Sequence, residues 1–144
     1  MQATIKWVGN VMFVGHSGSG HSIVIDGPPT AGGNNAGIRP MELLLMGLGA
    51  CTSFDVISIL KKSRQDVTDC YTELEAERAD EIPQVFTRIH VHFVISGHDL
   101  KPQQVARAVD LSAEKYCSAS IMLAKTAEIT HDFEIIELNS ASTH

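Results

Sequence analysis

The sequence has no run of lysine or arginine. Its 11 Lys and Arg residues stand against 17 Asp and Glu residues, which gives a formal net charge of −6. Nucleic acids and anionic membrane surfaces both attract proteins through clustered positive charge. The charge pattern therefore argues against a nucleic-acid partner and against a membrane partner.

Long apolar runs and a secretory leader are also missing. The longest apolar run, residues 43–50, is shorter than the roughly 18 residues that a membrane helix needs. Residues 1–6 lack the basic region and apolar core of a signal peptide. Three cysteines is an odd number, which a secreted disulfide framework rarely has. We therefore expect a cytoplasmic protein.

The N-terminal half predicts three short strands and one long helix. Apolar, β-branched runs cover 3–8 and 11–14, joined at Gly9-Asn10, and a third strand covers 23–25. Residues 27–38 are rich in glycine and asparagine and predict a loop. Pro40 suits the first turn of a helix, and Lys61-Lys62 suits its last turn, so we predict a helix over 40–62.

The C-terminal half predicts a long hairpin, a second helix and a closing strand. Apolar residues alternate with polar ones over 67–78 and 85–95, which indicates two strands with one buried face. A second helix begins near Pro102, with an apolar stripe at helical spacing: Val105, Ala108, Val109, Ala113, Tyr116 and Cys117. A last strand covers 129–135. The order βββ-α-ββ-α-β predicts an α+β fold without the repeating βαβ of a parallel sheet, in a single domain over 1–138 with a tail at 139–144.

Two cysteines fall on the two predicted helices. Cys51 lies in a helical segment that is apolar nearly all round, so we expect this segment to be buried. Cys117 lies near the end of the second helix. In a chain of cytoplasmic type, this arrangement suggests a redox pair rather than a structural disulfide. Asp55 lies one turn beyond Cys51, and an unpaired buried aspartate is costly, so we expect it to meet a cation, a water molecule or an open cleft.

Buried cysteines are more often inert hydrophobic residues than reactive ones. Cys70 fits that interpretation because it lies on the apolar face of a strand. For Cys51 the pattern alone leaves the reactive and the inert interpretations open. His90 and His92 could bind a metal together, but two histidines on the polar face of a sheet is the interpretation that we favour. The glycine-rich residues 15–22 lack the lysine of a phosphate-binding loop and predict a hairpin connection.

The segment Pro-Met-Glu-Leu-Leu-Leu-Met-Gly-Leu-Gly-Ala-Cys at 40–51, followed by Ala-Glu-Lys-Tyr-Cys-Ser at 113–118, resembles the OsmC/Ohr family. Within that family it is most similar to the YhfA-like branch, and the resemblance covers nearly the whole chain. It implies antiparallel sheets that wrap two central helices in an intertwined homodimer. A homodimer would explain why the helix is apolar on all sides.

The resemblance also implies an activity, the thiol-dependent reduction of organic hydroperoxides. Cys51 would be the peroxidatic thiolate, which becomes a sulfenic acid. Cys117 would be the resolving thiol, which condenses with it to a disulfide that an external dithiol then reduces. No cofactor and no metal are implied.

The chain departs from the family where the thiolate is stabilised. Hydroperoxide reductases of this family have a glutamate directly after the helix-starting proline and an arginine from the N-terminal strands. This chain has Met41 at the first position, and no arginine precedes Arg39. We therefore take Arg39, Glu42 and Asp55 as the candidate substrate-binding or charge-stabilising residues.

Three functions compete at this point. The first is the hydroperoxide reductase. The second is a binding or regulatory protein that keeps the fold without efficient turnover, and the third is a structural dimer with inert cysteines. The pKa of Cys51 discriminates among them, because only the thiolate is a nucleophile.

Overall fold

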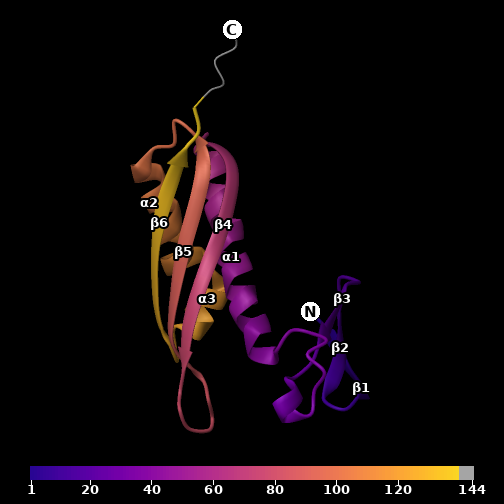
Figure 1. Cartoon of the computed structure of the whole chain (residues 1–144). Helices are drawn as coiled ribbons and strands as arrows, with labels where there is room; N and C mark the ends of the chain where they lie inside the picture. The colour runs from indigo at the N-terminus through magenta and orange to yellow at the C-terminus, as the bar shows by residue number, and fades with distance from the viewer. Residues whose placement is uncertain (140–144) are drawn as a thin grey trace. The chain divides into compact units, whose positions relative to one another are not determined.

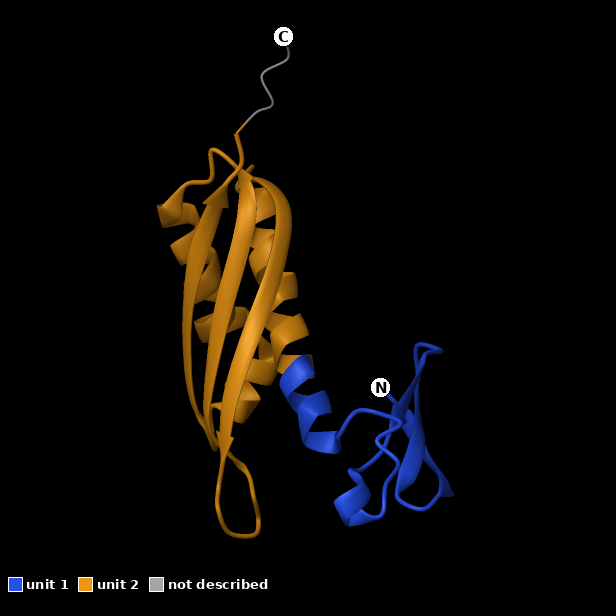
Figure 2. Cartoon of the chain, in the orientation of Figure 1, with its two compact units in different colours: residues 1–46 blue, residues 47–144 orange. Residues whose placement is uncertain are grey.

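The computed structural model of the chain describes residues 1–139, which form two compact units, unit 1 over Met1–Met46 and unit 2 over 47–139 (Figures 1 and 2). The boundary between the units falls inside helix α1, which runs over Pro40–Lys62 as predicted. Each unit contains its own three-stranded sheet. The single domain over 1–138 stays a prediction. Of the predicted tail, only Asn139 is among the described residues.

Unit 1 contains an antiparallel meander, sheet A. Its strands are β1 (Ala3–Gly9), β2 (Met12–Ser17) and β3 (Ser22–Ile25), paired in that order. Gly9 and Asn10 have φ angles of 122° and 47°, so they make the predicted turn between β1 and β2. The glycine-rich residues 15–22 include the end of β2, the start of β3 and the turn that joins them, which confirms the predicted hairpin connection.

The loop after β3 is organised around one buried carboxylate, Asp26. Asp26 is 1% exposed and accepts backbone hydrogen bonds from Gly27 (2.7 Å), Asn34 (3.0 Å) and Ala36 (3.0 Å). These N–H donors, Ala36 first, hold the pKa of Asp26 below its ordinary value. The loop, which includes the short helix η1 (Pro29–Ala31), is therefore a packed element.

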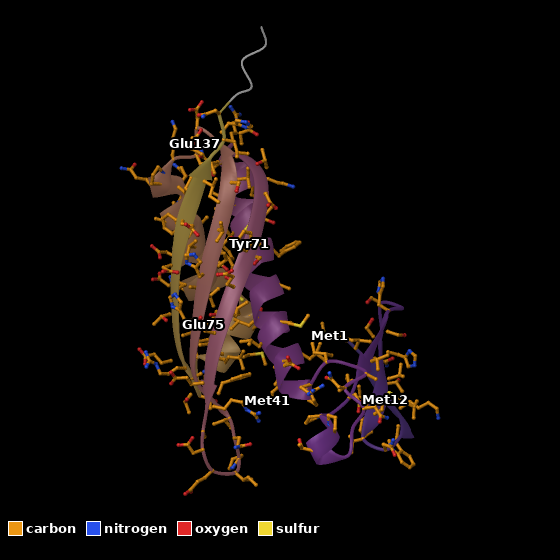
Figure 3. All side chains as sticks on the ribbon, viewed as in Figure 1. Met1, Met12, Met41, Tyr71, Glu75 and Glu137 are labelled. Carbon is orange, nitrogen blue, oxygen red and sulfur yellow. The ribbon has the colours of Figure 1, made fainter. Side chains whose placement is uncertain are left out.

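Unit 2 contains sheet B, with strands β4 (Asp66–Arg78), β5 (Phe86–His98) and β6 (Glu128–Glu137) in that order. The helices of this unit cover one face of the sheet (Figure 1). Residues Ile89, Val91, Phe93 and Ile95 of β5 are at most 3% exposed, which confirms the predicted alternation. Tyr71 and Glu75 of β4 are exposed on the polar face (Figure 3). The α+β fold and the element order are as predicted.

One strand pairing differs from the antiparallel sheets that we expected. β6 runs parallel to β5, with Ile89 opposite Ile129 and Phe93 opposite Phe133. Residues 99–127, which carry the helices, separate these strands, and a parallel pair needs a crossover of a dozen or more residues. The chain thus contains one βαβ unit beside the antiparallel hairpin of β4 and β5.

The second predicted helix is divided into three pieces: α2 (Pro102–Leu111), a π-helical turn η2 (Ser112–Tyr116) and α3 (Ser118–Leu123). In the π turn the N–H of Cys117 donates to the carbonyl of Ser112 at 2.8 Å. This extra residue shifts the helical face, so Ser112 and Cys117 are fully buried while Tyr116 is 51% exposed. The predicted burial of Tyr116 is therefore wrong.

Helix α1 is buried along one stripe rather than all round. Leu48, Val56 and Leu60 are at most 1% exposed, whereas Met46 and Phe54 are 56% and 73% exposed. The prediction that the helix is buried on all sides is therefore wrong for a single chain. By length and composition α1 could also span a membrane, although its apolar run without polar interruption is as short as predicted. Core helices of soluble proteins pass the same test.

Candidate functional site

The two predicted cysteines meet in unit 2. The Sγ atoms of Cys51 and Cys117 and a carboxylate oxygen of Asp55 all lie within 4.8 Å of one another. We call these three residues the thiol cluster. Both thiols are free. Helix α1 supplies Cys51 and Asp55, one turn apart, and the π turn brings Cys117 to them. The predicted approach of Cys51 to Cys117 is confirmed.

The two sulfurs differ in their environments. Cys51 is half-buried, while Cys117 is 0% exposed. Burial, and then a hydrogen bond with Cys51, raise the pKa of Cys117 to about 12. Cys117 also caps α3, because its Sγ accepts a hydrogen bond from the N–H of Ser120 at 3.3 Å. At neutral pH Cys117 is therefore a thiol, and it is the sulfur that the surrounding protein holds in position.

Asp55 belongs to a network of hydroxyl groups between α1 and the π turn. The hydroxyl of Ser112 contacts Asp55 Oδ2 at 3.2 Å and the carbonyl of Thr52 at 3.3 Å, and lies 2.8 Å from the hydroxyl of Thr52. When Ser112 donates to the carboxylate, the Thr52 hydroxyl donates to Ser112. Every hydroxyl in the network then has a partner, and Asp55 has a defined orientation toward the thiols.

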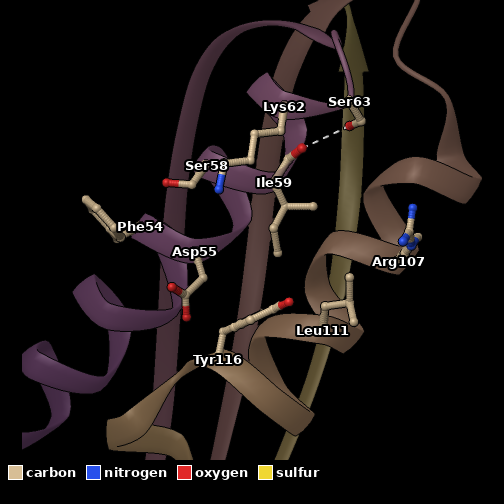
Figure 4. A pocket seen from close by; sticks show the side chains of 9 residues that line it. All are labelled: Phe54, Asp55, Ser58, Ile59, Lys62, Ser63, Arg107, Leu111 and Tyr116. Carbon is tan, nitrogen blue, oxygen red and sulfur yellow. Dashed lines mark hydrogen bonds between the residues drawn. The ribbon is translucent and has the colours of Figure 1, made fainter.

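Asp55 also lines an open cleft of about 530 Å³ in unit 2 (Figure 4). Its walls combine apolar side chains, including Phe54 and Leu111, with the cations of Lys62 and Arg107 and the ring of Tyr116. The expectation that Asp55 meets an open cleft is confirmed. Of the thiol cluster, Asp55 is the member that lines this cleft, and apolar side chains form part of its walls.

Arg39 and Glu42 interact at the start of α1, in unit 1. The Glu42 carboxylate accepts a hydrogen bond from the N–H of Arg39 at 2.9 Å, which caps the helix. The Arg39 guanidinium donates to the carbonyl of Gly37 at 3.0 Å and to the side chain of Asn35 at 2.8 Å. The structure therefore gives Glu42 a capping role and orders the guanidinium of Arg39 against the loop.

Three residues of the site were missed from the sequence: Ser112, Thr52 and Arg107. A signal for Ser112 was present, because it follows Ala108 and Val109 at helical spacing and is a polar residue on an apolar stripe. Thr52 follows Cys51 directly and gave no separate signal. Arg107 lies on the polar side of α2, where a charged residue is ordinary, so only the folded structure relates it to the cleft.

The remaining thiol and the paired histidines lie elsewhere on sheet B. Burial raises the pKa of Cys70 in β4, consistent with the inert residue that we predicted. On the polar face, Asp132 Oδ1 lies 3.0 Å from His90 Nε2 and 2.6 Å from His92 Nδ1, while His92 Nε2 lies 3.3 Å from Glu134. We call these four residues the histidine–carboxylate cluster. It confirms that the two histidines share the polar face of the sheet.

The sequence and the structure of the chain are both similar to those of known proteins. The chain is 51% identical over 139 residues to protein YhfA of Escherichia coli K12, across 94% of this chain and 98% of that one. Among solved structures, an organic hydroperoxide resistance protein OsmC of Legionella pneumophila covers 93% of this chain and 97% of its own, with 16% identity and a TM-score of 0.70. The match to the organic hydroperoxide resistance protein OhrB of Bacillus subtilis covers 93% of this chain and 98% of OhrB, with 20% identity and a TM-score of 0.61. The model of the OsmC-like protein family matches residues 32–132, and the chain belongs to this family.

Proposed function

We propose that this protein reduces organic hydroperoxides with two cysteines, Cys51 as the attacking and Cys117 as the resolving residue. One observation carries the proposal: a half-buried sulfur lies within 4.8 Å of a fully buried one, and the same distance limit holds for the carboxylate of Asp55, which lines an open cleft. Accessibility favours Cys51 as the sulfur that a peroxide reaches. Membership of the OsmC family supports the same chemistry.

The proposed reaction has three steps. The Cys51 thiolate attacks one peroxide oxygen, the O–O bond breaks, and the departing alkoxide takes a proton to leave as an alcohol. Protonated Cys51 sulfenic acid then condenses with the Cys117 thiol, forming a disulfide and releasing water. An external dithiol reduces the disulfide and is itself oxidised. Because the bond is only about 2 Å long, the two sulfurs must approach further for the second step.

The raised pKa of Cys117 supports this division of roles. A thiol that keeps its proton is a poor nucleophile toward peroxide, so the protonated Cys117 does not compete with Cys51 for the first step. After Cys51 is oxidised, the same thiol is the nearest partner for condensation, since its sulfur is held against Cys51.

Positive charge near Cys51 would favour the thiolate, and Asp55 cannot supply it because a carboxylate opposes a neighbouring negative charge. Arg39 is the cation among the three candidates, and we assign it that role in the assembled protein. Glu42 would act indirectly by capping the helix that begins after Arg39.

The cleft supports an organic rather than an inorganic peroxide. Its walls include Phe54, Ile59 and Leu111, which would bury the apolar part of a substrate. Two solved structures of this fold, from Legionella pneumophila and Bacillus subtilis, are organic hydroperoxide resistance proteins, which supports the same substrate class for this chain.

We further propose that the working unit is a homodimer in the cytoplasm. Only 28% of the apolar window of α1 is buried, and Trp7 of β1 is 63% exposed. Apolar surface of this kind is stabilised when a second chain covers it, and obligate interfaces commonly bury more than about 2,000 Å². Sedimentation should show a dimer at micromolar concentration, and a stable folded monomer would contradict this assembly.

Consumption of cumene hydroperoxide and of hydrogen peroxide, with a dithiol donor, tests the activity. Cys51→Ser should consume neither peroxide. Cys117→Ser should consume about one equivalent of cumene hydroperoxide and then stop with a trappable sulfenic acid on Cys51. Cys70→Ser is the matched control and should keep full turnover. If the wild-type protein consumes no peroxide and no sulfenic acid is trapped, the protein is a binding protein of this fold.

A further inference from the structure

The thiol cluster has the composition of a site for a thiophilic metal ion. It combines two cysteine sulfurs with a carboxylate oxygen, and the three atoms lie within 4.8 Å of one another. Zinc binds cysteine sulfur at about 2.3 Å and carboxylate oxygen at about 2.0–2.2 Å, usually in a tetrahedral arrangement. Donor atoms around one zinc ion are therefore roughly 3.5 Å apart, and small side-chain movements would bring these three atoms to that spacing.

The residues around the cluster provide the supporting contacts that such a site requires. Ser112 contacts Asp55 Oδ2 at 3.2 Å, and the N–H of Ser120 donates to the Cys117 sulfur at 3.3 Å. Contacts of this kind orient the ligands of a metal and strengthen its binding. Cys117 and Ser112 are fully buried, so two of these groups are held by packing.

We propose that the reduced protein binds a divalent zinc ion through Cys51, Cys117 and Asp55, with the fourth position open to water. Both cysteines bind as thiolates, so any thiol protons that they carry leave to the solvent as the ion binds. A cysteine that ligates zinc has its sulfur lone pair engaged by the metal. Zinc binding and attack on a peroxide therefore exclude each other at Cys51.

Zinc is thus a reversible inhibitor that also keeps the pair reduced. The inhibition rests on the proposed hydroperoxide reduction, whereas the binding does not. A protein without peroxidase turnover would still bind zinc, and a peroxidase without the metal site would still turn over. The two failures are therefore distinguishable.

The histidine–carboxylate cluster is the competing site on this chain, and its geometry is less suitable. A single oxygen of Asp132 contacts both histidines, at 3.0 and 2.6 Å, on an open face where the Asp132 side chain is 58% exposed. His90 Nε2 and His92 Nδ1 therefore face an oxygen that already lies between them, and the other two ring nitrogens contact Thr130 and Glu134. The double variant His90→Asn/His92→Asn removes this site and serves as the reference protein for the test.

Titration of the reduced, metal-free full-length protein with zinc alone, against a chromogenic chelator, measures stoichiometry and affinity. One zinc per chain is expected in the wild-type protein and in the histidine double variant. Cys51→Ser, Cys117→Ser and Asp55→Asn should each weaken binding, and Ser112→Ala should weaken it by about tenfold. Cys70→Ser, the matched thiol control, should bind as the wild type does.

Cobalt provides a second measurement, which reports on the identity of the ligands. Cobalt added to the reduced protein should give a thiolate-to-metal absorption band that the Cys51→Ser variant reduces and that prior formation of the Cys51–Cys117 disulfide abolishes. The proposal is overturned if zinc binding disappears in the histidine double variant, if it is unchanged in both cysteine variants, or if cobalt gives no thiolate band with the folded wild-type protein.

Discussion

The thiol cluster and the histidine–carboxylate cluster lie on opposite sides of sheet B in unit 2. The pKa shifts in the first favour a neutral group, and those in the second favour charged groups. On the helix-covered face, burial raises the pKa of Cys117 to about 12 and keeps it neutral. On the open face, hydrogen bonds to Asp132 and Glu134 raise the pKa of His92, and His92 in turn lowers the pKa of Asp132, so that both favour their charged forms. Desolvation is the main cause of the pKa shift of Cys117, whereas hydrogen bonds between oppositely charged groups are the main cause of the shifts of His92 and Asp132.

This difference shows why only one of the two clusters is a candidate reaction centre. In the proposed reaction, the neutral buried thiol of Cys117 is the partner that condenses with the more accessible Cys51, and the structure has the two sulfurs within 4.8 Å of each other. A paired histidine and carboxylate on an open face satisfy each other and leave no unmatched reactive group. The predictions below test this contrast between the two faces.

The largest effect on stability is expected for Phe93, which is next to His92 on β5 but points to the covered face. Phe93 is 1% exposed, so Phe93→Ala should lower the free energy of unfolding by about 3–5 kcal/mol through lost burial and a residual cavity. Chemical denaturation measures it. His92→Ala, on the open face, is the neighbouring control, and an equal loss for the two variants would contradict the assignment of the faces.

A smaller effect is expected at the hydroxyl network beneath the thiols. Ser112→Ala leaves Asp55 and the Thr52 hydroxyl without this buried partner, and should lower the free energy of unfolding by about 1–3 kcal/mol. The exposed Ser118 in the same region is the matched control, and Ser118→Ala should change stability by less than about 0.5 kcal/mol. A stability loss for Ser118→Ala as large as that for Ser112→Ala would mean that the network has no specific role.

Much of this contrast was predictable from alternation and helical spacing. Period-two patterns identified the covered and open faces of β4 and β5, and the bounds of α1 followed from Pro40 and Lys61-Lys62. The parallel pairing of β6 was not predictable, because strand direction depends on the path of the connecting helices. The π turn was not predictable from the sequence either. It inserts one extra residue into the helical turn, and its sequence contains no proline or glycine that would indicate an irregularity.

The same limit applies to the candidate site. The two cysteines were found from their positions on helices, and Asp55 from its cost as a buried charge. Arg107 was not found, because an arginine on the polar side of an amphipathic helix is ordinary, and Ser112 was overlooked although it is a polar residue at the spacing of the apolar stripe. The buried Asp26 was missed for a related reason, since its three backbone partners come from a loop whose conformation no periodicity describes.

The smallest effect concerns pH and the open face. The pKa of His92 is raised in the folded protein, so its contribution is present below about pH 6.5 and is lost as the pH rises through the folded value. The pKa of Asp132 is lowered, so its contribution is present above about pH 4 and is lost as the pH falls through the folded value. The pair should therefore stabilise most between these limits. Denaturation midpoints of wild type and His92→Asn should converge above this window, and a constant difference up to pH 9 would contradict the assignment.

Peptide mapping after oxidation tests the central claim most directly. The reduced protein is treated with one equivalent of cumene hydroperoxide without a reductant, its remaining thiols are alkylated, and the digest is analysed by mass spectrometry. We predict a disulfide between the Cys51 and Cys117 peptides, with Cys70 alkylated. Recovery of Cys51 and Cys117 both as alkylated thiols, or a disulfide that includes Cys70, would contradict the assignment of the thiol cluster as the reaction centre.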